Sequence, residues 1–135
     1  MRPNTLSEAY DRIIAGETAE KAFAEFLDRF YALGDPEARS IALSDEPGLT
    51  GDAHLDALAG AAAEYLAKQY EARVPPWANG EARRLALPWF TTEQPGPGIN
   101  EYLWHCSPAE FRWRNIFTES QPFRRASQRH ESSSR

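Results

Sequence analysis

The sequence predicts an all-α fold: one small domain of about five to six helices, with a Pro- and Gly-rich loop segment and a disordered C-terminal tail. Helix-capping residues precede several segments, and apolar residues within those segments recur three and four positions apart. The longest segment is rich in alanine and leucine. A chain of 135 residues can bury a core without a disulfide or a metal ion. We expect residues 1–124 to form the domain and residues 125–135, which offer almost nothing to bury, to be the tail.

The first two helices are predicted by their caps and their apolar spacing. Thr5 and Glu8 have the spacing of a capping box, and Gly16 is a suitable end for the helix that follows. After Thr18, phenylalanine, tyrosine and leucine residues recur at helical spacing up to Gly34. This second helix has the most aromatic apolar stripe of the chain, so we expect it to contribute heavily to the core.

A short third helix and a long fourth helix follow. Asp35 before Pro36 indicates a helix start, because proline is tolerated in the first turn. Residues 52–72 begin with an aspartate and contain many alanines, which favour a helix strongly. Gly60 lies in the middle of this helix among alanines, and such small residues predict the close approach of another helix.

Residues 74–100 have a different composition, with five of the ten prolines. Trp77 and Trp89 each follow a proline, so we expect them to be anchors pressed onto the helices. Residues 78–85 are expected to form one or two helical turns. Residues 91–100 read TTEQPGPGIN, and this run predicts an exposed loop in which the PGPG glycines do not open a helix.

The C-terminal part of the chain predicts two more helices. A short helix is expected over residues 99–106. Ser107 then has the character of an N-cap, Pro108 fits the first turn, and Glu110 is placed to complete a capping box. The second helix is therefore predicted to start at Ser107 and to run to about Phe117.

The net charge of −5 is unevenly distributed. Residues 1–72 have a balance of −8, whereas residues 111–135 have +4. This asymmetry fits a charged partner, a docking surface, or attraction between two parts of one fold. The single cysteine, Cys106, excludes an intramolecular disulfide and a thiolate metal cage built by one chain. No apolar run approaches the roughly 20 residues of a membrane helix, and the N-terminus lacks a signal-peptide pattern, so we expect a cytoplasmic protein without membrane contact.

Candidate catalytic and metal-binding residues are few. His105 and Cys106 are neighbours, but adjacent side chains on a helix diverge and do not make a nucleophile–base pair by themselves. His54 with Asp52 and Asp56 offers metal-ligating groups, although capping and the helix dipole already explain carboxylates at a helix start. The sequence has no nucleophile elbow, phosphate-binding glycine loop or HExxH motif. We therefore expect a protein that is not an enzyme and that holds no cofactor or metal.

The segment FRWRNIF allows two interpretations. Arginine and tryptophan concentrate binding energy at protein interfaces, so Arg112 and Arg114 beside Trp113 indicate a binding surface. In the other interpretation, Phe111, Trp113 and Phe117 belong to the core, and the arginines pair with the acidic first half of the chain.

Residues 50–127 resemble a known group of short bacterial proteins. The resemblance is carried by the order DAHLDALAGAAAEYLA, ARRLALPWF, EYLWHCSPAEFRWRNIF and RRAS, and most specifically by PWF and SPAEFRWRNIF. The genes beside members of this group often encode nucleotidyltransferase-like toxins, and related segments follow helix-turn-helix domains in antitoxins. The resemblance implies an antitoxin-like or companion protein that binds a partner enzyme and has no chemistry of its own. Residues 1–49 match only loosely and contain no convincing helix-turn-helix. The resemblance therefore does not imply transcriptional autoregulation by this chain.

The leading hypothesis is therefore an antitoxin-like inhibitor that binds and neutralises a partner toxin, with a nucleotidyltransferase-like enzyme as the expected partner. The candidate partner-binding residues are Trp77, Arg84, Trp89, Phe90, Arg112, Arg114 and Phe117. The alternative is nucleic-acid binding through FRWRNIF and FRRASQRH, where arginines would contact phosphates and aromatic rings would stack on bases. A third hypothesis, an enzyme that uses His105 or Cys106, has the least support.

Overall fold

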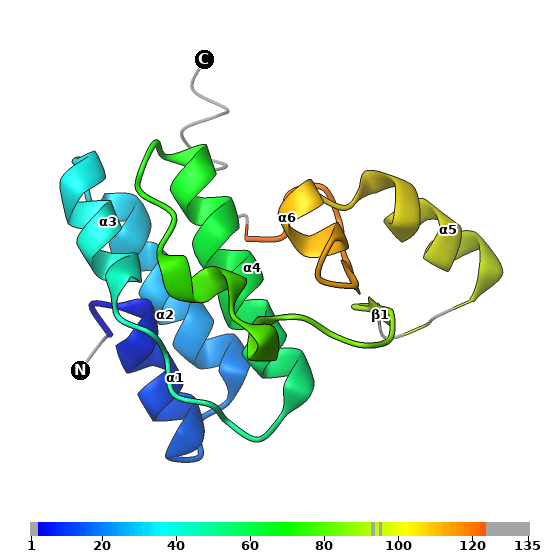
Figure 1. Cartoon of the computed structure of the whole chain (residues 1–135), viewed down its shortest axis with the longest axis horizontal. Coiled ribbons are helices and arrows are strands. Elements are labelled where there is room, and N and C mark those ends of the chain that lie inside the picture. The colour runs from blue at the N-terminus through cyan, green and yellow to red at the C-terminus, as the bar shows by residue number, and fades with distance from the viewer. Residues whose placement is uncertain (1–2, 93, 95, 124–135) are drawn as a thin grey trace.

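The computed structural model describes residues 3–92, 94 and 96–123 (Figure 1). The predicted all-α class is confirmed, because helices dominate these residues and the two strands have two residues each. In chain order the elements are α1 (Leu6–Ile14), α2 (Ala19–Ala32), α3 (Pro36–Ser44), α4 (Ala53–Gln69), the 3-10 helices η1 (Pro76–Asn79) and η2 (Glu81–Arg83), β1 (Trp89–Phe90), α5 (Pro97–Cys106), α6 (Ala109–Arg112) and β2 (Ile116–Phe117). The tail predicted over residues 125–135 lies outside the described residues.

The predicted caps of the first four helices are confirmed. Thr5 and Glu8 form a complete capping box at α1. Thr18, Asp35 and Asp52 accept hydrogen bonds from backbone N–H groups at the starts of α2, α3 and α4. These side chains satisfy donors that a helix start leaves without an intrahelical acceptor, and each therefore specifies where its helix begins.

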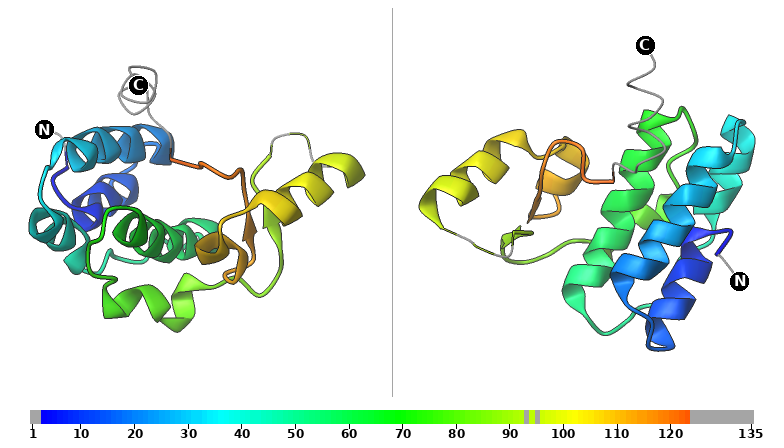
Figure 2. Two further views of the ribbon diagram at one scale, coloured as in Figure 1. Left: turned by 90° about the horizontal axis from the view of Figure 1, so that it is seen from above. Right: turned by 180° about the vertical axis from the view of Figure 1, so that it is seen from behind.

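Helices α1 to α4 form a bundle around the main hydrophobic core (Figures 1 and 2). The aromatic stripe of α2 is buried in it, as predicted, through Phe23, Phe26 and Phe30. The hydroxyl of Tyr10 on α1 donates a 2.6 Å hydrogen bond to the carbonyl oxygen of Leu55 on α4. Burial raises the pKa of Tyr10 well above its ordinary value, so this phenol remains a neutral donor.

Helix α4 is covered on a second side by the C-terminal part of the chain. Ala57 and Ala61 pack there against Phe111 and Ile116 in a separate apolar cluster. Gly60 lies between the two sides, and a Cβ atom on this glycine would lie 2.7 Å from Cβ of Arg83. The predicted close approach is confirmed, although its partners are the two short 3-10 helices and an arginine side chain rather than a long helix.

The helix predicted from Ser107 to Phe117 is wrong. Helix α6 ends at Arg112, because Asn115 has a left-handed φ of 66° and turns the chain into β2. β2 then pairs in parallel with β1, with Trp89 opposite Ile116. Ser107 is the C-terminal cap of α5, and its Oγ accepts a 2.7 Å hydrogen bond from the backbone N–H of Thr118, so the predicted capping box with Glu110 is not formed.

The prediction of a loop over residues 91–100 is wrong at its C-terminal end. Helix α5 begins at Pro97, two residues before the predicted start, and therefore includes Gly98. Proline at the first helical position needs no hydrogen-bond partner for its nitrogen, which explains why PGPG opens a helix here after all. The turns predicted over residues 78–85 are confirmed as parts of η1 and η2.

Candidate functional site

The residues that carry most of the predicted site form a structural unit beside α4. We call residues 84–118, apart from Glu93 and Pro95, the C-terminal lobe; it contains β1, α5, α6 and β2. It lies on the side of α4 that faces away from α1 and α2 (Figures 1 and 2). Backbone N–H groups of Leu85, Trp89 and Thr91 donate hydrogen bonds of 2.8–3.1 Å to carbonyl oxygens in or next to β2. These bonds hold the two parallel segments of the lobe, residues 85–91 and 114–117, together.

Arg114 joins the C-terminal lobe to the helical bundle and is fully buried. Its Nη1 atom donates 2.7 Å hydrogen bonds to Oε1 of Glu64 and to the carbonyl oxygen of Glu110, and its Nη2 atom donates one of 2.7 Å to the carbonyl oxygen of Ala78. A buried guanidinium needs such partners because loss of hydration is costly. Arg114 therefore belongs to the core interpretation of FRWRNIF, as do the buried Phe111 and Phe117.

Glu64 is the carboxylate that balances Arg114. Burial by itself raises the pKa of Glu64, but hydrogen bonds from Lys68, Arg114 and Trp113 outweigh burial and lower this pKa to about 2. Burial in turn lowers the pKa of Arg114, and the bond to Glu64 opposes that effect. The ion pair is therefore complete near neutral pH and is a structural element between α4 and the C-terminal lobe.

Arg83 has a similar buried position that the sequence did not predict. Its Nη2 atom donates hydrogen bonds of 2.7 Å to the carbonyl oxygen of Pro47 and 3.0 Å to Glu46, and its Nη1 atom one of 3.2 Å to the carbonyl oxygen of Asp56. Nothing local distinguishes Arg83 from the neighbouring Arg84. The absence of a side chain at Gly60 is the only sequence signal that a bulky group approaches α4 here.

Trp77 and Trp89 are anchors, as predicted. The indole nitrogen of Trp77 donates a 3.0 Å hydrogen bond to the carbonyl oxygen of Leu43, and the ring packs against the main core. Trp89 stacks on the ring of His54 at a centroid distance of 4.3 Å. Trp77 thus contacts the helical bundle, whereas Trp89 connects the C-terminal lobe to the start of α4.

Phe90 and Phe117 are brought together in a stack of aromatic rings. Phe117 lies between Phe90, at a centroid distance of 5.0 Å, and Trp104 of α5, at 4.6 Å. Phe117 is buried, Phe90 is half-buried and Trp104 is 49% exposed. The stack therefore leads from the interior of the C-terminal lobe to its surface, where Trp104 presents an ordered aromatic ring.

Helix α5 is the most exposed element of the C-terminal lobe. Leu103 is its one buried residue among those described. Ile99, Tyr102 and Trp104 expose between 42% and 58% of their surface, which is unusual for large apolar side chains within one short helix. None of the three was predicted as a site residue. The aromatic residues of EYLWHC are the sequence signal that could have indicated Tyr102 and Trp104.

Arg84, Arg112 and Trp113 are exposed on the surface of the C-terminal lobe. The guanidinium carbon of Arg84 lies 4.9 Å from the centroid of the Trp113 ring, and that of Arg114 lies 4.3 Å from it. The indole nitrogen of Trp113 donates a 3.1 Å hydrogen bond to Glu64. The interface interpretation of FRWRNIF therefore remains open for Arg112 and Trp113.

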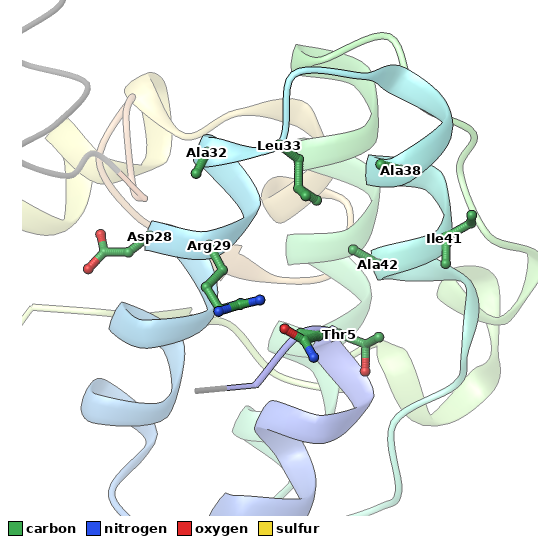
Figure 3. Close-up of a pocket in the computed structure, with 9 residues that line it drawn as sticks. Thr5, Asp28, Arg29, Ala32, Leu33, Ala38, Ile41 and Ala42 are labelled. Atoms are coloured by element: carbon green, nitrogen blue, oxygen red, sulfur yellow. The ribbon is translucent and has the colours of Figure 1, made fainter. Parts of the chain in front are cut away.

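A pocket of about 550 Å³ lies elsewhere, between the start of α1, the end of α2 and α3 (Figure 3). Ala32, Leu33 and Ala42 contribute apolar surface, and Arg29 extends toward the N-terminal end of α1. None of the predicted site residues lines this pocket.

Three of the candidate metal and catalytic residues, Asp52, Asp56 and Cys106, have hydrogen-bond partners within the fold. Asp52 caps α4, and Asp56 accepts hydrogen bonds from the backbone and hydroxyl of Thr50. Cys106 lies 3.6 Å from the carbonyl oxygen of Thr118. Over residues 3–92, 94 and 96–123, no three His, Cys, Asp or Glu side chains gather in a geometry suited to a metal ion.

Comparisons of the chain with family models, curated proteins and solved structures find no match. Within the part of the chain that the structure describes, no helix combines the length and apolar character needed to cross a membrane.

Proposed function

We propose that this protein is a non-catalytic interaction module, an antitoxin-like inhibitor that acts in the cytoplasm by binding and neutralising a partner toxin. The observation that carries the proposal is the exposure of Tyr102 and Trp104 on α5. The resemblance of residues 50–127 to bacterial companion proteins supports a nucleotidyltransferase-like enzyme as the partner. In this proposal α5 is the central contact, and the residues around it extend the surface.

The physical basis is the rigidity of the exposed rings. Trp104 stacks on Phe117 with an interplanar angle of 8°, so its rotamer is held before a partner arrives. A side chain that is already ordered loses less conformational entropy on binding. Large aromatic residues of this kind are enriched among the residues that dominate binding energy.

Nucleic-acid binding has less support. The guanidinium groups of Arg84 and Arg114 both lie over the ring of Trp113, which competes with stacking of a base on that ring. The charge of Arg114 is balanced by Glu64. The second segment of this hypothesis, FRRASQRH, falls almost entirely outside the described residues.

Co-expression with the product of the neighbouring gene tests the proposal. The tagged chain should co-purify with that product in a fixed ratio after nuclease treatment, and it should relieve any growth arrest that the product causes. The variant Tyr102→Ala should weaken the complex by at least about tenfold. Tyr102 is 58% exposed and makes no ring contact or hydrogen bond with a described residue, so the fold should be unaffected.

Ile41→Ala is the matched control. Ile41 is 57% exposed on α3, at the far side of the bundle from α5 (Figure 1). This variant should bind like the unchanged chain. A chain that purifies alone beside a harmless neighbour would overturn the proposed function, and equal binding by the Tyr102 variant would remove α5 from the interface.

A further inference from the structure

The indole ring of Trp104 is covered on one face only by the described chain. That face stacks on Phe117 at a centroid distance of 4.6 Å and an interplanar angle of 8°. Trp104 nevertheless exposes 49% of its surface, and no other ring or cation of the described residues is stacked on it. Helix α5, which carries Trp104, lies at the outer end of the C-terminal lobe (Figures 1 and 2). The second face of this indole is therefore open to a partner.

Two of the other three tryptophans have a guanidinium over the ring. The guanidinium carbon of Arg83 lies 5.1 Å from the centroid of the Trp77 ring. Those of Arg84 and Arg114 lie 4.9 Å and 4.3 Å from the centroid of the Trp113 ring. The π electrons of an aromatic ring attract a cation to its face, and tryptophan does so most strongly. The fold itself therefore uses arginine to cover indole faces, and the open face on α5 offers the same chemistry to another chain.

A carboxylate occurs three positions before Trp104 on the same helix. Glu101 is exposed and forms no ion pair with a described residue. It is the one carboxylate of α5, which contains no lysine or arginine. Side chains three positions apart are neighbours on the surface of a helix, so Glu101 and Trp104 can contact the same group. A guanidinium satisfies both, because it stacks on an aromatic ring with its plane and donates hydrogen bonds to a carboxylate along its edge.

We propose that Trp104 and Glu101 together receive an arginine side chain of the partner protein. This inference rests on the proposed function and names the group that the partner presents to α5. The net charge of −5 also favours a partner with a basic surface. A nucleobase stacks on tryptophan as well, but the carboxylate of Glu101 repels the phosphates that accompany a base. A lysine meets the carboxylate only as a point charge and lacks the planar group that matches the indole.

Substitutions at Glu101 test the inference, because they report the sign of the charge that the partner presents. Binding of the co-purified partner is measured by biolayer interferometry at about 50 mM and about 300 mM NaCl. At low salt we expect Glu101→Gln to raise Kd by about threefold to tenfold and Glu101→Lys by more than about thirtyfold, with smaller effects at high salt. The thermal unfolding midpoint should stay unchanged, because Glu101 is exposed. Trp104→Leu should raise Kd by about tenfold, since leucine is apolar but has no π face.

Glu20→Gln is the matched control, because Glu20 is an exposed glutamate on α2 without an ion pair to a described residue. Its Kd should stay within about twofold of the unchanged chain. If the complex forms but both Glu101 variants bind as tightly as the unchanged chain, or more tightly, the arginine inference is overturned and the proposed function stands. If the unchanged chain forms no complex, both are overturned. Binding of a labelled single-stranded oligonucleotide that Trp104→Leu abolishes would replace the arginine with a nucleobase and overturn the inference.

Discussion

Arg114 and Glu64 form a 2.7 Å ion pair across 50 positions of sequence, and this pair connects α4 to the C-terminal lobe. The guanidinium is fully buried, and its Nη1 and Nη2 atoms also donate to backbone carbonyl oxygens of two further segments. One side chain thus joins α4, η1 and α6.

Replacing Arg114 with methionine should lower the free energy of unfolding by about 3 kcal/mol, because removal of one member of a buried pair leaves the other polar groups uncompensated. Urea denaturation followed by circular dichroism measures this change. Arg112→Ala is the comparison, and it should shift the free energy of unfolding by no more than about 0.5 kcal/mol, since Arg112 is exposed. Equal effects of the two variants would contradict the structural role of Arg114.

Acid should remove the contribution of Glu64 to stability. The pKa of Glu64 falls from its ordinary value of 4.5 to about 2 in the folded protein, despite the opposing effect of burial. The unfolded chain therefore binds this proton first, and the stabilisation that is complete above pH 4.5 is lost as the pH falls toward 2. The variant Glu64→Gln should lose less stability than the unchanged chain between about pH 5 and about pH 3 in urea titrations. Parallel pH profiles would show that Glu64 does not titrate as described.

Gly60→Ala should destabilise the protein although alanine favours a helix by up to about 1 kcal/mol over glycine. The new Cβ would lie 2.7 Å from Arg83 Cβ and 2.9 Å from the carbonyl oxygen of Ala78, and this overlap should cost about 1–3 kcal/mol. Gly98→Ala in α5 is the control, because its Cβ meets no atom within 4 Å. Thermal unfolding should show a lower midpoint for Gly60→Ala and an equal or higher one for Gly98→Ala. A stabilised Gly60 variant would mean that α4 is not approached this closely.

Asn115→Ala should loosen the turn between α6 and β2. Asn115 has a φ of 66°, and its Nδ2 atom donates a 2.7 Å hydrogen bond to the carbonyl oxygen of Leu85. Alanine loses this bond and adopts the left-handed conformation at a cost, so the variant should be less stable by about 1–3 kcal/mol in urea denaturation. Asn115→Gly loses the same bond but tolerates the backbone angle, and it should be less damaging. An equal loss in both variants would assign the whole effect to the hydrogen bond.

The first half of the fold was predictable because its signals are local. Each of Thr5, Thr18, Asp35 and Asp52 caps the helix that directly follows it, so the start of a helix can be recognised within a few residues. The end of α6 has a different origin. The turn at Asn115 depends on hydrogen bonds with the segment around Leu85, which lies 30 positions away. The spacing of apolar residues over 107–117 gives no indication of this contact with Leu85.

The candidate site shows the same division. Arg112 and Arg114 are separated by one residue and look alike in the sequence, but one is exposed and the other is fully buried. The difference is made by Glu64 and by the carbonyl oxygen of Ala78, both distant along the chain. Sequence composition could therefore identify the segment, but only the tertiary structure distinguishes an arginine that supports the fold from one that is free to bind.

The position of Arg114 near the C-terminal end of the described chain has a consequence for protein synthesis. When the ribosome has released α1 to α4, it has not yet released Arg114, whose guanidinium pairs with Glu64. It has also not yet released Phe111 and Ile116, whose side chains cover Ala57 and Ala61. One side of α4 therefore stays in contact with water until residues 111–116 have left the ribosome. Docking of residues 111–116 then closes that side, so a message truncated before codon 111 would yield a chain with an exposed apolar surface that invites proteolysis and aggregation.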